Sequence, residues 1–178
     1  MNTLQLIEQF TDVAQKVDTT VTVITKSAEE LEKTLLKLTD EEGEIVLADP
    51  DDLDPALFES FRKKSSRIIQ NPDDKQMAGA KYGISDCFCA VARTGSVCVS
   101  ITEKMGGSYS LYPRVHIAIV DSDTIVARPR DIFSQSPLKE KALNRDFIFV
   151  SGSSATADMG PLVRGVHGPG KLHVIFLK

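Results

Sequence analysis

The sequence lacks most of the features that would place it in a specialised class of protein. Its 178 residues include only three cysteines, too few for a disulfide framework. The net charge is −4, so no excess of lysine and arginine points to nucleic acid. No apolar run approaches the ~20 residues that a membrane-spanning helix needs. We therefore expect a protein that binds neither nucleic acid nor membrane.

The first residues also lack the marks of a secretion signal. Glu8 and Asp12 interrupt the apolar pattern there, and no basic start or cleavage site is present. This predicts a cytoplasmic protein. A chain of this length suits one domain that buries roughly 70% of its unfolded surface, so we expect a single domain over residues 1–178, of which residues 1–18 form an N-terminal helix.

The cysteines allow two interpretations. Cys87 and Cys89 would share one face of a strand, and a hairpin turning at Thr94 and Gly95 could bring Cys98 to the same face. A metal or cluster site is one reading, but the spacing is not that of paired zinc or iron–sulfur ligands. Free cysteine is among the most buried residue types, so we expect three core residues, no metal and no cofactor bound by this chain.

Helical and strand patterns alternate along the chain. Apolar residues at helical spacing predict a helix over 3–17, and a Ser27–Glu30 capping box predicts a second helix with Leu31, Leu35 and Leu38 on its apolar face. Strands are predicted at 20–25, 44–48, 87–92, 97–101, 115–120, 124–127, 147–150 and 172–177, with a further helix at 56–63. This alternation is typical of an α/β domain with a mainly parallel sheet.

The stretch 146–178 is the most informative part of the chain. Its two apolar runs, 147–150 and 172–177, suit strands covered on both faces, and a helix is predicted from about Ala155. The small residues 151–154 would then lie at a helix start, where free N–H groups and the helix dipole favour an anion. Ser153, Ser154 and Thr156 are the expected hydrogen-bond donors, and Asp158 is expected either to cap the turn through backbone amides or to orient Thr156 or Arg164. The alternative is a plain helix cap.

Two motifs in this sequence resemble the LUD domain, the lactate-utilisation family of LutC and YkgG. The first is Gly152-Ser153-Ser154-Ala155-Thr156-Ala157-Asp158 followed by Gly165-Val166-His167-Gly168-Pro169. The second is Gly83-Ile84-Ser85, Ala90-Val91-Ala92 and Thr94-Gly95-Ser96. Arg93 and Phe88 stand where that family has acidic residues, so this chain departs from the family pattern beside Thr94 and Gly95.

The resemblance implies a Rossmann-like three-layer sandwich of the NagB/RpiA/CoA transferase-like type. It further implies an accessory subunit of an iron–sulfur complex that oxidises L-lactate to pyruvate, with the redox centres in the iron–sulfur partner subunits. A stand-alone transferase or isomerase of the same fold, or a non-catalytic small-molecule-binding protein, are the alternatives, and homo-oligomer formation stays open.

The implied ligand is a small anion, with Thr94, Gly95, Ser153, Ser154, Thr156, Asp158 and His167 as candidate binding residues and the catalytic residues unknown. His116 and His173 fall at strand starts and are expected to be structural, because ligands of open α/β sheets gather at the carboxyl ends of strands. A simple crossover would place His167 far from Ser153 and Ser154, unless the glycines of its loop let the chain fold back.

Overall fold

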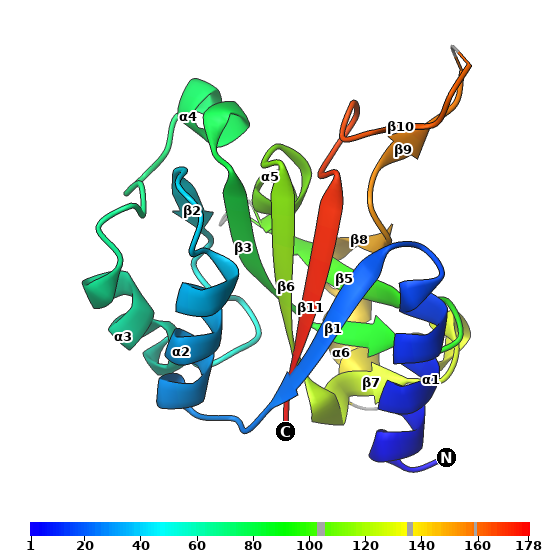
Figure 1. The fold of residues 1–178 in the computed structure, drawn as a ribbon. Coiled ribbons are helices and arrows are strands. Elements are labelled where there is room, and N and C mark those ends of the chain that lie inside the picture. Colours follow the sequence, from blue (N-terminus) through cyan, green and yellow to red (C-terminus); the bar gives the residue numbers. More distant parts are fainter. Residues whose placement is uncertain (103–105, 135–136, 159) are drawn as a thin grey trace.

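A five-stranded parallel sheet forms the centre of the computed structural model, which describes residues 1–102, 106–134, 137–158 and 160–178 (Figure 1). The strand order is β1-β11-β6-β3-β2, and every neighbouring pair is parallel. The strands are β1 (Thr19–Ile24), β2 (Ile45–Leu47), β3 (Tyr82–Cys87), β6 (Val115–Asp121) and β11 (Lys171–Leu177). The predicted α/β architecture with a mostly parallel sheet is therefore confirmed.

Helices cover one face of this sheet. α2 (Ala28–Leu38) and α3 (Ala56–Lys64) enclose an apolar core with the side chains that alternate strand residues direct toward them, among them Ile84, Ile117 and Ile175. α4 (Asp74–Gly79) and α5 (Gly106–Leu111) pack a smaller cluster around Val46, which alternates with Ile45 and Leu47 and therefore lies on the opposite face of the sheet. Among the described helices, none has the length and apolar character that a membrane crossing requires.

The opposite face is covered by α1 (Thr3–Gln15) and by a second sheet. The second sheet has the order β7-β4-β5-β8, with β4 (Cys89–Val91), β5 (Ser96–Ile101), β7 (Ile125–Val126) and β8 (Asp146–Ser151). Its outer face packs against η2 (Pro129–Phe133) and α6 (Leu138–Leu143), while η1 (Ser122–Thr124) links β6 to β7. Helices, parallel sheet and second sheet thus make successive layers.

The N-terminal helices form where the local sequence predicts them. Asn2 and Gln5 cap α1 reciprocally, and Phe10 is fully buried on its apolar face. Ser27 caps α2 by accepting from the backbone N–H of Glu30. The hairpin between residues 87–92 and 97–101 is also present, with Cys89 opposite Cys98.

The prediction for residues 147–150 is wrong in one respect. This run is a strand, β8, but it pairs antiparallel with β5 at the edge of the second sheet and is only partly buried. A continuous apolar run was taken as a strand covered on both faces. In the structure β8 is instead the edge strand of the smaller sheet, and its side chains are only partly covered.

The helix predicted from Ala155 is also wrong. Residues 155–158 and 160–164 lie in an exposed arm whose two short strands, β9 (Ala155–Thr156) and β10 (Val163–Arg164), pair antiparallel. In Figure 1 the arm projects from the end of the molecule where β11 begins. Glycine and proline at 160 and 161 disfavour a helix beyond one turn. The argument from a helix dipole therefore does not apply to residues 151–158.

The three cysteines are buried, as predicted. Cys87 faces the core under α1, whereas Cys89 and Cys98 lie on the outer face of the second sheet, so the three do not share one face. A hydrogen bond with Cys98, together with burial, raises the pKa of Cys89, and burial raises that of Cys87. Cys87 and Cys89 are therefore held as protonated thiols.

Candidate functional site at the amino end of the parallel sheet

Three cationic residues lie in a row where the central parallel strands begin. Lys81 precedes β3, Arg114 precedes β6, and Lys171 is the first residue of β11. The register places Val115 opposite both Tyr82 and Lys171, so the three strands start at the same level. Because parallel strands all begin at one edge of a sheet, cations far apart in the sequence are gathered there.

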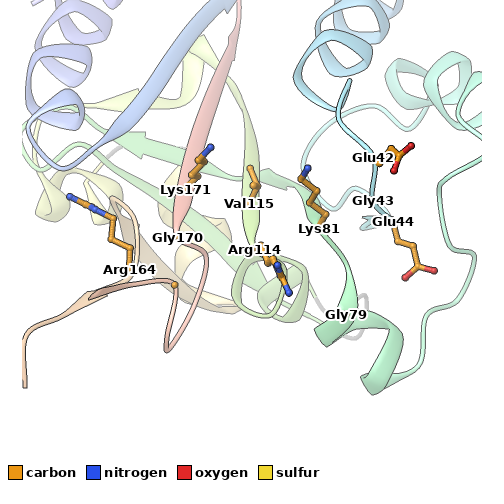
Figure 2. Close-up of a pocket in the computed structure, with 11 residues that line it drawn as sticks. Glu42, Gly43, Glu44, Gly79, Lys81, Arg114, Val115, Arg164, Gly170 and Lys171 are labelled. Carbon is orange, nitrogen blue, oxygen red and sulfur yellow. The ribbon is translucent and has the colours of Figure 1, made fainter. Parts of the chain in front are cut away.

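These residues line an open cleft of about 940 Å³. Its walls are the strand starts, the turn at residues 42–44, the end of α4 and the loop that leads into β11 (Figure 2). In Figure 2 the side chains of Lys81 and Lys171 extend to one side of the strand ends, and that of Arg114 to the other. The cleft therefore offers cations on both sides of the sheet edge.

Two of the cations at this cleft already have partners. Lys81 pairs with Glu41, and the hydrogen bond between them raises the pKa of Lys81 and lowers that of Glu41. Arg164 pairs with Asp18 and also donates to Ser153 Oγ at 2.7 Å. Within the described part of the chain, neither Arg114 nor Lys171 forms an ion pair, and both are exposed. These two are available to an anionic ligand.

The glycine-rich loop 165–170 folds back over the start of β6. The Gly170 N–H donates to the Arg114 carbonyl at 3.0 Å, and the Ser154 N–H donates to the Pro169 carbonyl at 2.8 Å. The Gly165 N–H donates to the Ser154 carbonyl at 3.0 Å. The glycines thus produce the return that a simple crossover would not, and His167 lies close to Ser153 and Ser154, with which it lines a groove of about 260 Å³.

His167 also lines a hollow of about 290 Å³ together with Arg114 and Tyr112. This hollow adjoins the larger cleft, because Arg114 and Gly165 line both. Arginine presents a planar fork of donors that matches a carboxylate, and a histidine beside it can donate or accept a hydrogen bond. The junction between the two hollows can therefore hold a small carboxylate or phosphate.

The other predicted ligand-binding residues do not lie together in the structure. Ser153 is engaged by Arg164, and Ser154 lies in the groove with His167. Thr156 and Asp158 lie on the arm, where the Asp158 N–H approaches Thr156 Oγ1 at 3.4 Å. The arm thus carries these two residues away from the sheet edge, and their binding of an anion stays a prediction.

Thr94 and Gly95 lie in a turn beneath the end of α1. Gly95 has φ +61°, and a Cβ at this position would lie 2.9 Å from the Ala14 nitrogen, so only glycine fits. Thr94 Oγ1 accepts from Ser96 Oγ at 2.7 Å, and Ser96 Oγ lies 2.6 Å from Ser151 Oγ. This turn connects β4 to β5, and the neighbouring Ser96 contacts β8. Ligand binding by Thr94 and Gly95 stays a prediction.

The two strand-start histidines are held inside the fold. His116 is fully buried with Nε2 2.9 Å from Ser85 Oγ, and burial lowers its pKa to about 3. Its Nδ1 has no partner among the described residues. His173 contacts Thr20 and Thr22 of β1, and burial lowers its pKa as well. Both histidines are therefore neutral parts of the fold, as predicted.

The carboxyl end of the sheet is closed by internal pairs. Asp86 Oδ2 near the end of β3 accepts from the backbone N–H groups of Asp51, Asp52 and Leu53, at 3.0, 2.6 and 2.9 Å. The Asp52 side chain, 4% exposed, pairs with Lys141 at 2.8 Å and Arg145 at 3.0 Å. Burial raises the pKa of Asp86. The polar groups that a ligand would use at this end are occupied by one another.

Sequence reasoning missed Arg114 and Lys171, although a signal was present. Arg114 and Lys171 each directly precede the apolar residues of a predicted strand, whereas the strand that follows Lys81, β3, was not predicted. A cation in that position on several parallel strands predicts a basic edge. Among the described residues, no group of three or more histidine, cysteine, aspartate or glutamate side chains is placed to hold a metal ion.

Comparison with solved structures supports the fold. The chain is similar over its full length to the crystal structure of a DUF162 family protein from Deinococcus radiodurans, with a TM-score of 0.74 and 20% identity, covering 99% of that chain. At this identity the likeness concerns the fold alone.

Curated sequences add the family context. The chain is 35% identical over 105 residues to lactate utilization protein C of Bacillus licheniformis, covering 56% of this chain and 43% of that protein. It is 33% identical over 107 residues to the protein of the same name from Bacillus subtilis, covering 58% and 45%. An uncharacterized protein of Neisseria meningitidis, NMB1437, is 28% identical over 149 residues, covering 82% and 60%. The chain thus spans about half the length of the curated relatives that it matches.

The LUD domain matches residues 7–177, which include the sheet, the arm and the glycine-rich loop. The chain therefore belongs to the LUD domain family.

Proposed function

We propose that this chain is a LutC-like lactate utilisation protein that binds a small carboxylate at the amino end of its parallel sheet. It works in the cytoplasm as an accessory subunit of an iron–sulfur complex that oxidises L-lactate to pyruvate. The observation that carries the proposal is the position of Arg114, an unpaired arginine between the cleft and the hollow that contains His167. The family match and the relatives named lactate utilization protein C support the substrate class.

The binding mode follows from the donors at this junction. Arg114 supplies two parallel N–H donors to the carboxylate, and each charge-assisted hydrogen bond contributes about 1.5 to 3 kcal/mol. His167 contacts the hydroxyl or keto oxygen next to the carboxylate. Lys171 raises the local positive potential without contacting the ligand directly, since it extends to the other side of the sheet edge. Lactate and pyruvate are small enough for this hollow.

The division of labour follows from the chemistry of the side chains. Lactate oxidation removes two electrons, and the thiols of this chain are buried in the core. We assign the electron transfer to the iron–sulfur partner subunits, and to this chain the binding of substrate or product. This accessory role differs from a stand-alone transferase, whose covalent nucleophile would be expected where Arg93 stands.

A co-purification experiment tests the assignment. The chain, tagged in its native host grown on L-lactate, should bring down iron-containing proteins, and its deletion should abolish growth on L-lactate but not on glucose. The Arg114→Met variant, expressed in the deletion strain, should restore the association with the iron-containing proteins but not full growth on L-lactate. Normal growth of the deletion strain on L-lactate, or recovery of the chain without any iron-containing partner, would contradict the proposal.

A further inference from the structure

The outer edge of β8 has the properties of a protein interface. β8 is the last strand of the second sheet, with β5 on one side, and its sequence is Asp-Phe-Ile-Phe-Val-Ser. Phe149 is 46% exposed, and Phe133 beside the strand is 45% exposed. Exposed apolar edge strands are templates for pairing with another strand, and proteins usually protect them with lysine, proline or a bulge. β8 carries none of these and has one charge, Asp146 at its start. Leu111 of α5 and the loop residues 167–169 line a groove beside Ile148–Ser151.

The other sheet edges of the described chain do not share these properties. β2 has three residues and β7 has two, which is too short for stable pairing. β1 has six residues, but its Thr20 and Thr22 are polar and hold His173. β8 is therefore the long apolar edge among the described strands.

The alternation of the antiparallel ladder identifies the backbone groups that face outward. The Phe88 N–H donates to the Cys98 carbonyl at 3.0 Å, so the backbone of Cys98 faces β4. Its neighbour Val99 then faces β8, where it is opposite Ile148. Ile148 and Val150 consequently bond to β5, whereas the N–H and C=O groups of Phe147 and Phe149 point away from the sheet.

We propose that a second copy of this chain pairs with this edge, β8 against β8, around a two-fold axis at Ile148. The outward backbone N–H and C=O groups of Phe147 in each copy would then hydrogen-bond to those of Phe149 in the other copy. Two such residue pairs form, one on each side of the axis. The phenyl rings of Phe147 and Phe149 extend the aromatic cluster that they already form, with centroids 5.5 Å apart, across the interface.

The negative charge of Asp146 favours antiparallel pairing of the two copies of β8. With the axis at Ile148, Asp146 lies opposite Val150 of the other copy, and the two Asp146 carboxylates lie at opposite ends of the interface. A parallel arrangement would set them side by side, which is unfavourable. A self-complementary strand edge is also what a symmetric dimer requires, because both copies present the same surface.

Light scattering over a dilution series tests the dimer. The wild-type chain should have twice the mass of one chain at high concentration, and Phe149→Lys should raise the dimer dissociation constant at least about tenfold. Val23→Lys is the matched control, since Val23 is 45% exposed on edge strand β1 and should leave the dimer unchanged. Thermal unfolding of all variants confirms that each is folded. A wild-type chain that is monomeric throughout, or equal effects of the two lysines, would overturn the proposal.

The register can be tested by cross-linking. Ile148→Cys should form an intermolecular disulfide under mild oxidation, because the two copies of residue 148 face each other across the axis. Val150→Cys should not, since residue 150 faces Asp146 of the other copy. Cross-linking through residue 150 and not residue 148 would exclude this register.

Discussion

The two ends of the parallel sheet differ in how their charges are used. At the carboxyl end, Asp86 is bound by three backbone amides and Asp52 by two cations, so the polar groups satisfy each other. At the amino end, Arg114 and Lys171 lie on an open cleft that Glu42 and Glu44 also line, and among the described residues neither cation forms an ion pair, although the charge of Lys171 helps to lower the pKa of Glu41. Ligands of α/β sheets usually bind at the carboxyl end. In this chain we assign the carboxyl end to stability and the amino end to binding.

The largest effect should come from opening the carboxyl end. Asp86→Ala leaves three backbone N–H groups without their acceptor in a nearly closed site, and we expect it to lower the free energy of unfolding by about 3 to 4 kcal/mol. Asp86→Asn retains an acceptor oxygen and should cost less than half as much. Urea unfolding measures both. If the alanine variant is as stable as the asparagine variant, the turn at 51–53 is not held by Asp86.

A steric change in β3 should have the next largest effect. A Cβ at Gly83 would lie 2.1 Å from the Tyr109 carbonyl oxygen and 2.5 Å from Pro113 Cγ. Gly83→Ala should therefore push α5 and the start of β6 away from β3 and destabilise the fold by about 2 to 3 kcal/mol. Gly79→Ala is a suitable control, because nothing lies within 4 Å of a Cβ there. Equal melting temperatures for the two variants would refute this packing account.

Acid should weaken the fold through His116. Burial holds its folded pKa at about 3, below the unfolded value of about 6.5, so only the unfolded chain takes up the proton between pH 7 and 5. Stability from this residue is present above pH 6.5 and is lost as the pH falls, by about 2 kcal/mol at pH 5. His116→Gln should reduce this loss in urea titrations at the two pH values. An unchanged pH dependence would mean that His116 titrates normally in the folded chain.

The smallest effect is expected at the arm. Arg164 pairs with Asp18, but their side chains are 42% and 61% exposed, so solvent screens the pair. Arg164→Met should change the free energy of unfolding by about 0.5 kcal/mol. It should nevertheless release Ser153 and increase proteolysis of the arm, relative to Arg130→Met, which replaces an arginine of η2 whose side chain is 74% exposed. A loss of stability comparable to that of Asp86→Ala would contradict the view that the arm is peripheral.

The elements with strong local signals were predictable from the sequence. The helical spacing of Leu4, Ile7 and Phe10 located α1, and β-branched or apolar runs located β1, β6 and β11. The sheet to which a strand belongs was not predictable in the same way. The run Phe147–Val150 is as apolar as Leu172–Leu177, yet its partners are decided by long-range packing under α1 rather than by its own residues.

The candidate site was predicted in part. Ser154 and His167 were both predicted as site residues and line one groove, but the helix expected at Ala155 is a short strand. A small-residue run followed by Thr156 and Asp158 suits a helix start as well as a turn, and local sequence does not separate the two. Arg114 was overlooked because its importance depends on the strand order, which brings it next to the loop 165–170.

The binding of a small carboxylate by Arg114 is the central claim, and calorimetric titration tests it most directly. L-lactate and pyruvate should bind the wild-type chain, and Arg114→Met should weaken that binding at least about tenfold while the melting temperature stays within about 2 °C. Arg130→Met should bind like the wild type. If neither anion binds the wild-type chain, or if the two arginine variants bind alike, the amino-end cleft is not the site that we propose.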